Sequence, residues 1–364
     1  MPPNLTAYAH LFPILLRLKL LGLTSRFPPL PGGVLDEQTR LLRRGQEVLG
    51  EGPLDQISPT QARLNFLASF RFLKSLGGIF EKVDSTRELE IPGPGCKIPA
   101  RLYLPGKQPD YALFILLHGG GFVFGDLDTA DNMARFICRR ADCAVLSVDY
   151  RLAPEQCFPA AVDDCYAVVR WAVEHAAEIS ADPRKVLVGG DSAGGTLSAV
   201  MAQMARKNGT PWLAGQVLFY PSTNSAALDT PSYKQFGEQS LGLPTRDVNW
   251  FLDQYTPDPK ERLDPLVSPL LEKDLRGLPP ALVVTAEFDV LRDEGETYAR
   301  RLGQAGVPVK LLRCNGMIHG FLSLPGLIQR ATEYFDQIIV EIRRLATAKG
   351  VPSGWQNEWD VDYL

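Results

Sequence analysis

One pentapeptide constrains this chain more than any other feature: GDSAG at residues 190–194, which fits the pattern G-x-S-x-G. A short β-branched run at 186–188 precedes it and is typical of a buried strand, and the small-residue segment after it is typical of a buried helix. A serine on such a strand-to-helix turn is held in a strained conformation with its hydroxyl exposed, and the first N–H groups of the helix favour negative charge above it. The pattern predicts a nucleophile at Ser192; the alternative is a glycine-rich turn with an incidental serine.

Composition and charge exclude several classes of function. The chain has 364 residues, of which 45% are hydrophobic and 22% are charged, as in an ordinary globular protein. A net charge of −4 without a basic stripe argues against a nucleic-acid partner. Six cysteines without a C-x-x-C pair predict free thiols and a cytoplasmic location. The four histidines have no metal-binding spacing, so no metal site is indicated, and a catalytic histidine must be one of these four.

The first 85 residues predict apolar helices. The segment 11–23 is too short to span a membrane and lacks the order of a secretion signal, so we expect a packed amphipathic helix. The alternative is that this segment contacts a membrane surface or a partner. Residues 58–61 have the spacing of a capping box and predict a helix that begins at Pro59 and ends at the glycine pair 77–78.

From Arg87 the pattern changes to strands, and then to strands that alternate with helices. The strands at 87–91 and 98–104 flank a proline- and glycine-rich turn, and we expect them to pair in antiparallel fashion. Further strands are predicted at 113–117, 144–148, 186–188, 217–220, 282–285 and 309–312. Helices are predicted at 132–141, 160–175, 193–207, 295–305 and 329–345. Continuous apolar strands between helices predict a mostly parallel central sheet covered on both faces.

Two stretches interrupt or follow this alternation. No strand is predicted between Tyr220 and Leu282, and a structureless loop of that length is improbable, so we expect an inserted helical segment. The tail, residues 352–364, carries Trp355, Trp359 and Tyr363 among polar residues. It is predicted either to dock on the body of the protein or to form an interface.

A second glycine-rich stretch, HGGGF at residues 118–122, follows the strand at 113–117. Glycines there allow backbone N–H groups to approach a ligand closely. Beside a nucleophile turn, such a loop supplies hydrogen-bond donors for an oxyanion, and the N–H of Ala193 would be the other donor. The alternative is a flexible glycine turn. We expect His118 to hold this loop by hydrogen bonding and not to act as a base.

The general base is predicted at His319, which follows the nucleophile in the chain and lies in a glycine-flanked loop after the strand at 309–312. Ligand sites form at this edge of open α/β sheets, although a surface-loop histidine is the alternative. The orienting acid is expected after the strand at 282–285, where Glu287 and Asp289 are both close to the strand end. Asp293 and Glu294 are expected to be solvated charges at the start of the next helix.

Five motifs in this order resemble the hormone-sensitive-lipase-like branch of the α/β-hydrolases, which includes the bacterial family IV carboxylesterases and arylacetamide deacetylase. They are HGGG at 118–121, DYRLAPE at 149–155, GDSAGG at 190–195, DVLRDEG at 289–295 and HGF at 319–321. The resemblance implies an α/β-hydrolase fold with a mostly parallel central sheet, helices on both faces and a helical cap. It implies a cap built from residues 1–85 and 222–265, with residues 86–364 forming the catalytic domain.

The resemblance also implies roles for individual residues. Ser192 is then the nucleophile, Asp289 the acid and His319 the base. The oxyanion hole it implies comprises Gly119, in a supporting role, with Gly120, Gly121 and Ala193. The family usually has proline after the acid, and Val290 stands there in this chain, so we expect a slightly altered turn.

Together these features predict a carboxylic ester hydrolase that acts on short- to medium-chain acyl esters of small molecules through an acyl-enzyme, without a cofactor. A homodimer is common in the family. Candidates for the substrate pocket, each equally explained by core packing, are Phe122, Trp250, Phe251, Tyr255 and Phe321. One alternative is an amidase, lactonase or deacetylase with the same triad. The other is a small-ligand receptor on the same fold, and the presence of all three triad residues argues against it.

Overall fold

The structure is a computed structural model that describes residues 33–40, 53–75, 79–209, 213–239, 242–323, 325–347, 355 and 358–360. The expectations for the segment 11–23 and for the glycine pair 77–78 lie outside the described residues. None of the helices described is both long enough and apolar enough to cross a lipid bilayer.

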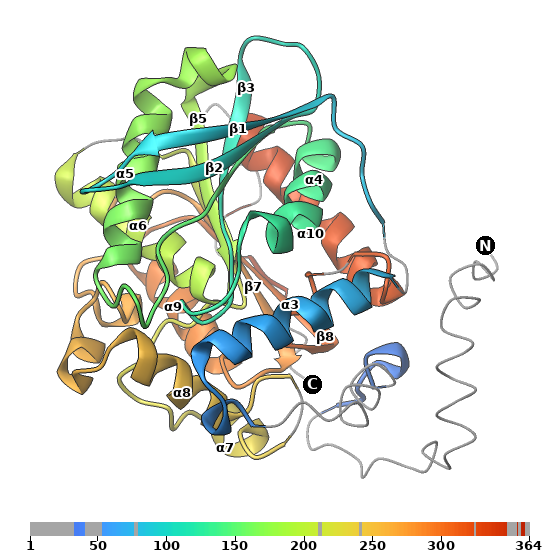
Figure 1. Ribbon diagram of the computed structural model, residues 1–364, viewed down its shortest axis with the longest axis vertical. Helices are drawn as coiled ribbons and strands as arrows, with labels where there is room; N and C mark the ends of the chain where they lie inside the picture. The colour runs from blue at the N-terminus through green and yellow to red at the C-terminus, as the bar shows by residue number, and fades with distance from the viewer. Residues whose placement is uncertain are drawn as a thin grey trace.

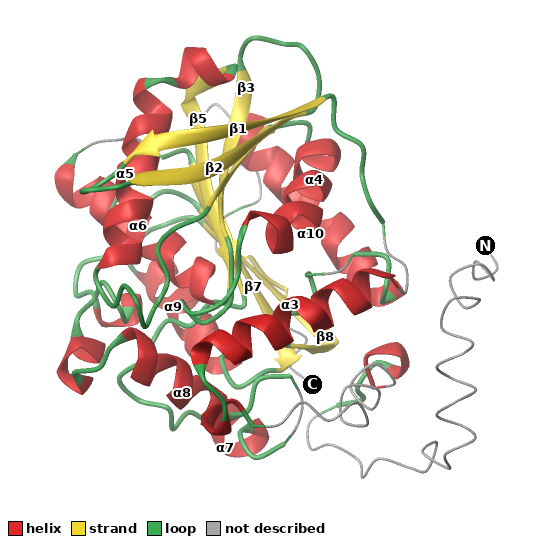
Figure 2. Cartoon of the chain, in the orientation of Figure 1, coloured by secondary structure: helices red, strands yellow, loops and turns green. Residues whose placement is uncertain are grey.

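Within the described residues, nine strands form one central sheet (Figures 1 and 2). The strands are β1 (Ser85–Pro92), β2 (Lys97–Leu104), β3 (Tyr111–Leu117), β4 (Ala144–Val148), β5 (Ala181–Asp191), β6 (Gly215–Phe219), β7 (Ala281–Phe288), β8 (Val309–Ile318) and β9 (Glu358–Asp360). Their order in the sheet is β1-β2-β4-β3-β5-β6-β7-β8-β9. β2 is antiparallel to both of its neighbours, whereas every other neighbouring pair is parallel. The predicted antiparallel start and mostly parallel sheet are both confirmed.

Helices lie before, between and after the strands along the chain. They are α3 (Pro59–Ser75), α4 (Leu127–Ala141), α5 (Ala160–Glu174), α6 (Ala193–Asn208), α7 (Pro231–Phe236), α8 (Thr245–Tyr255), α9 (Arg292–Gln304) and α10 (Gln329–Thr347), with short 3-10 turns at Leu54–Gln56, Ala176–Ile179, Pro259–Leu263 and Pro269–Leu271. α4 begins five residues before its predicted start because Asp126 and Thr129 form a reciprocal capping box. β8 runs six residues beyond its predicted end, so His319 follows the strand directly.

The alternation of side chains along the strands explains why both faces of the sheet are covered. Leu113, Ile115 and Leu117 of β3 join an apolar cluster that includes residues of α5 and α6. Phe114 and Leu116 point the other way, into a cluster that includes residues of α4 and α10. Successive strand residues face opposite sides, so an unbroken apolar strand requires helices on both.

Three helices lie apart from these two layers. In Figure 1, α7 and α8 lie at the lower end of the view, and α3 crosses the molecule above them. α7 and α8 belong to the stretch between β6 and β7, where the sequence predicts an inserted helical segment (residues 222–265, called the inserted segment below). The prediction of helices there is confirmed.

The C-terminal tail is docked on the body of the protein. Trp355 is fully buried, and its Nε1 donates a hydrogen bond of 2.8 Å to Oε2 of Glu341 on α10. Three residues further on, β9 pairs in parallel with β8 and covers the outer edge of that strand. Of the two alternatives predicted for the tail, Trp355 and β9 show docking on the body of the protein.

Candidate active site

Ser192 lies at the sharp turn between β5 and α6. Its φ of 54° and ψ of −119° fall in a backbone region that residues other than glycine rarely adopt. The turn is held by a 2.9 Å hydrogen bond from the Ser192 amide to the carbonyl of Phe219 at the end of β6. The strain is therefore imposed by the neighbouring strands, and it presents the hydroxyl at the carboxyl edge of the sheet.

Two glycines allow the chain to turn this tightly. A Cβ on Gly190 would lie 2.0 Å from the carbonyl oxygen of Leu117, and one on Gly194 would lie 1.9 Å from the same atom. Neither distance is compatible with a side chain. The pattern G-x-S-x-G is thus required by the close approach of β3 to both arms of the turn.

His319 joins Ser192 to Asp289 through two hydrogen bonds. Nε2 of His319 lies 2.9 Å from Oγ of Ser192, and Nδ1 lies 2.8 Å from Oδ2 of Asp289. With its proton on Nδ1, the imidazole donates to the carboxylate and accepts from the serine hydroxyl. The Asp289 side chain is fully buried, and that of His319 is 13% exposed. This is the arrangement in which a histidine can take a proton from a serine.

The two carboxylates near the end of β7 do different things. Only Asp289 faces the imidazole; its other oxygen, Oδ1, accepts a 3.0 Å hydrogen bond from the amide of Leu291. Glu287 accepts a 2.7 Å hydrogen bond from the amide of Gly316, in the β8 stretch that leads to His319. Glu287 therefore supports the loop of the histidine and does not touch its ring. Val290, which replaces the usual proline, is buried in an apolar cluster.

The glycine loop (residues 118–122) lies beside the serine, and Gly119 and Asp191 fix it there. The amide of Gly119 donates a 2.8 Å hydrogen bond to Oδ1 of Asp191, next to the serine in sequence. Burial raises the pKa of this carboxyl to about 6, although the Gly119 amide and nearby His319 oppose the change. Gly120 and Gly121 have φ values of 115° and 60°, and among the described residues no acceptor pairs with their amides. The amide of Ala193 is the first of α6 and has no partner within the helix.

His118 supports the loop as expected. Its Nδ1 lies 2.8 Å from the carbonyl oxygen of Gly119, and its ring stacks on Tyr150 with 4.3 Å between the centroids. The Tyr150 hydroxyl donates to the His118 carbonyl at 2.7 Å. Burial lowers the pKa of His118, so the ring is held neutral inside the protein.

The five aromatic pocket candidates separate into two groups. Four of them are at least nine-tenths buried and make core contacts: Phe122, Trp250, Tyr255 and Phe321. Phe251 is only partly buried, and its ring lies over Gly121, because a Cβ on that glycine would be 2.3 Å from two ring carbons. Of the five, Phe251 is therefore the side chain that lies against the glycine loop from outside the core.

The prediction for Glu294 is wrong. It was expected to be a solvated charge, but it is 1% exposed and accepts hydrogen bonds from the amides of Thr223 (2.7 Å) and Asn224 (3.2 Å). Burial raises its pKa to about 8. Asp293 is not a freely solvated charge either, because it accepts a 2.7 Å hydrogen bond from the amide of Ser232 on α7. These bonds span 61 to 71 residues of sequence, which no local pattern records.

Arg63 is a further residue that sequence analysis missed. From α3 it donates to the carbonyl oxygens of Val123 (2.7 Å) and Ala153 (2.6 Å) and to both carboxylate oxygens of Glu155 (2.8 and 2.6 Å). It thereby ties α3 to the backbone that follows the glycine loop. Glu155 ends the DYRLAPE motif, and the motif gave no indication of this partner.

Comparisons with known proteins agree with this geometry. A family model described as alpha/beta hydrolase fold matches residues 114–323. The carboxylic ester hydrolase LipN of Mycobacterium tuberculosis is 45% identical over 302 residues, covering 80% of this chain and 78% of that protein. The ethyl acetate hydrolase of Pseudomonas putida is 36% identical over 300 residues, covering 80% of this chain and 92% of that protein.

A solved structure matches over most of the chain. The hyperthermophilic esterase from the archaeon Pyrobaculum calidifontis superposes with a TM-score of 0.83 at 37% sequence identity. The match covers 86% of this chain and all of that one.

Proposed function

Because this chain belongs to the hormone-sensitive-lipase-like family of the α/β-hydrolase fold and is a carboxylic ester hydrolase, we propose that it cleaves short- to medium-chain acyl esters through Ser192, His319 and Asp289. One observation carries the proposal: the two hydrogen bonds, 2.9 and 2.8 Å long, that connect the strained serine to the histidine and the histidine to the buried aspartate. This arrangement activates a hydroxyl as a nucleophile.

The reaction follows from these contacts. As the Ser192 oxygen attacks the ester carbonyl carbon, its proton moves to Nε2 of His319, and the carbonyl π electrons move to the oxygen. Collapse of the intermediate breaks the bond to the alcohol oxygen, which leaves with the proton from Nε2. Water then attacks the acyl-enzyme by the same route and releases the carboxylic acid. Throughout, Asp289 holds the Nδ1 proton and stabilises the imidazolium.

The developing oxyanion is assigned to the amides of Gly120, Gly121 and Ala193. The support for this assignment is that these amides have no acceptor among the described residues, whereas Gly119 donates to Asp191. Removing one such donor costs about a hundredfold in rate in comparable sites. In this proposal Gly119 and Asp191 act by holding the loop.

We assign the acyl pocket to the space that Phe251 borders above the glycine loop. In this proposal α3 and the inserted segment form a cap over this space, and short acyl chains are the predicted substrates. The name of the Pseudomonas relative, an ethyl acetate hydrolase, agrees with a small substrate. None of the six cysteines, all of which lie in the part of the chain that the structure describes, forms a disulfide bond, which supports a cytoplasmic location. A homodimer remains a prediction, and contact of the segment 11–23 with a membrane surface remains the alternative to a packed helix.

The test is turnover of p-nitrophenyl esters of increasing acyl length by the wild type and by Ser192→Ala. Turnover that peaks at short chains and falls at least a thousandfold in the variant is expected. A peak at long chains would contradict the proposed pocket. Activity that survives in the variant, or activity confined to amides or lactones, would contradict the proposed function.

A further inference from the structure

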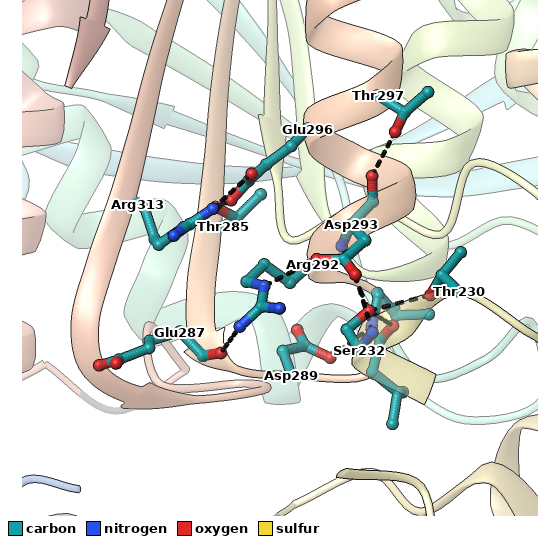
Figure 3. A network of polar contacts seen from close by, with 12 residues as sticks. Thr230, Ser232, Thr285, Glu287, Asp289, Arg292, Asp293, Glu296, Thr297 and Arg313 are labelled. Atoms are coloured by element: carbon teal, nitrogen blue, oxygen red, sulfur yellow. Dashed lines mark hydrogen bonds and ion pairs between the residues drawn. The ribbon is translucent and has the colours of Figure 1, made fainter. Parts of the chain in front are cut away.

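The first turn of α7 rests directly on the turn that carries the acid (residues 289–293, called the acid turn below; Figure 3). Oγ of Ser232 donates a 2.7 Å hydrogen bond to the carbonyl oxygen of Val290. The Ser232 amide donates to Oδ2 of Asp293 at 2.7 Å, and the Asp293 amide donates back to Oγ of Ser232 at 3.3 Å. Ser232 is fully buried. The Ser232 hydroxyl therefore donates one hydrogen bond to the acid turn and accepts another from it.

The peptide group between Val290 and Leu291 connects this hydroxyl to the acid. Its carbonyl accepts from Ser232, and its N–H donates to Oδ1 of Asp289 at 3.0 Å. A peptide group is planar, so its carbonyl and its N–H turn together. The hydrogen bond from Ser232 thus fixes the direction of the N–H that holds the acid, while Oδ2 of Asp289 faces the histidine.

Arg292 and Phe236 keep α7 in this position. Arg292 donates to Oδ1 of Asp293 (2.8 Å) and to the carbonyl of Glu287 (2.9 Å), and its guanidinium lies 5.4 Å from the centre of the Phe236 ring (Figure 3 shows the arginine and its partners). Phe236 belongs to α7, and it packs in one apolar cluster with Val290. The inserted segment and the acid turn therefore form one packed unit.

We propose that Ser232 is a positioning residue for ester hydrolysis, and that it holds the 290–291 peptide in the orientation in which Leu291 binds the carboxylate of Asp289. This inference rests on the proposed function, because it assigns Ser232 to the same triad. Without the hydroxyl, the buried carbonyl of Val290 loses its partner and the peptide is free to turn. The carboxylate then loses one of the two bonds that align it.

The sequence supplies a matched control in Ser268. It is also fully buried, its Oγ donates to the carbonyl of Arg262 at 2.7 Å, and the amide of Ser225 donates to it at 2.9 Å. It lies in the same stretch between β6 and β7, and none of these partners belongs to the acid turn. Ser268→Ala removes one donated and one accepted hydrogen bond without touching the 290–291 peptide. Ser232→Ala removes the corresponding two bonds and also the 3.0 Å contact with Oγ1 of Thr230.

The experiment compares Ser232→Ala, Ser268→Ala and Ser232→Thr with the wild type. Steady-state kinetics with p-nitrophenyl butyrate give kcat and KM, and proton NMR gives the far-downfield resonance of the His319–Asp289 hydrogen bond. For Ser232→Ala we expect kcat to fall about tenfold with KM within twofold, and the downfield resonance to shift or broaden. Ser268→Ala is expected to keep both values, and Ser232→Thr, which retains a hydroxyl, is expected to recover most of kcat.

Equal kcat values and an unchanged resonance in Ser232→Ala and Ser268→Ala would overturn the inference. If the alanine variant does not fold, Ser232→Cys and Ser268→Cys replace the pair, because a thiol weakens the donor without removing it. An unchanged kcat in Ser232→Cys would then overturn the inference. Failure of the proposed function is seen separately, as a wild type whose hydrolysis does not depend on Ser192.

Discussion

Helix α3 is attached just beyond the glycine loop through Arg63, which binds the Val123 carbonyl, and through Phe66, which stacks on Phe124 with 5.3 Å between the ring centroids. By contrast, α7 rests on the acid turn through a buried hydroxyl. The Arg63 side chain is 29% exposed and its partner Glu155 is 56% exposed, so water and salt screen part of this contact. Ser232 is fully buried beside an apolar cluster. α3 and α7 are thus attached to two parts of the candidate site through contacts that differ in their exposure to water.

This difference separates two tasks of the site. In the proposed mechanism the glycine loop provides donors for the charge that develops on the substrate oxygen, and α3 is attached near it. The acid turn, in the same proposal, aligns the groups that move the proton, and α7 is attached there. Changes at Arg63 of α3 should therefore affect charge stabilisation in a salt-dependent way, and changes at Ser232 of α7 should affect the proton relay at any ionic strength.

The largest effect on the acid side is expected from Asp289→Asn. The amide removes the negative charge that stabilises the imidazolium and favours the wrong tautomer, so kcat should fall about ten-thousandfold. Glu287→Gln, which changes the neighbouring carboxylate, should reduce kcat less than tenfold, because the Glu287 carboxylate binds the Gly316 amide and not the His319 ring. Steady-state kinetics of the two variants measure the difference, and equal losses would remove the distinction between the two residues.

The next largest effect lies on the oxyanion side, in Gly121→Ala. A Cβ there meets the Phe251 ring at 2.3 Å in a backbone of φ 60°, so the loop must move and kcat should fall by a factor of about 100 to 1,000. Gly209→Ala is the matched control, because Gly209 has φ 70° and nothing within 4 Å of an added Cβ. It should lower thermal stability slightly and leave kcat unchanged. Unaltered turnover in Gly121→Ala would contradict the role of the loop.

A smaller effect is expected when the attachment of α3 is broken. Arg63→Ala should lower kcat/KM about tenfold and the free energy of unfolding by about 1 kcal/mol. A high concentration of sodium chloride should lower the kcat/KM of the wild type toward that of the variant, because salt screens a partly exposed ion pair. Arg184→Ala serves as control, since it removes an exposed arginine that pairs with Asp182 far from the loop in sequence. A variant of Arg63 that keeps full activity at low salt would show that α3 is not coupled to the site.

The smallest effect on turnover is expected from Glu294→Gln, which tests the buried acid by its pH dependence. The folded pKa of about 8 lies above the ordinary value of 4.5, so between these values the folded chain holds a proton that the unfolded chain has lost. This contribution to stability is complete below pH 4.5 and is lost as the pH rises to 8. Urea unfolding of both proteins across this window should show the wild type losing stability relative to the variant. Parallel curves would contradict a raised pKa.

The residues of the proposed triad were accessible to sequence analysis because each belongs to a short motif at the end of a predicted strand. Parallel strands bring their carboxyl ends to one edge of the sheet, so separate motifs can be placed together without a structure. The choice between Glu287 and Asp289 was harder, because both are near the end of β7. The family resemblance selected Asp289, and in the structure it is the Asp289 side chain that faces the imidazole.

Other features had no local signal. Ser232 and Glu294 are bonded to backbone groups 58 to 71 residues away, so neither composition nor spacing indicates their burial. The aromatic pocket candidates show the same limit, because an aromatic residue near a site packs in the core as readily as it lines a pocket. The early start of α4 is different, since the capping box of Asp126 and Thr129 is visible in the sequence.

The most direct test of the central claim is mass spectrometry of the chain after reaction with diethyl p-nitrophenyl phosphate. The reagent reacts with a serine only when that serine is activated, so it reports the nucleophile itself. The account predicts one diethylphosphoryl group on the peptide that contains Ser192, with loss of esterase activity in proportion to labelling, and no labelling in His319→Ala. A label on a different residue, or full ester hydrolysis by chains labelled at Ser192, would contradict it.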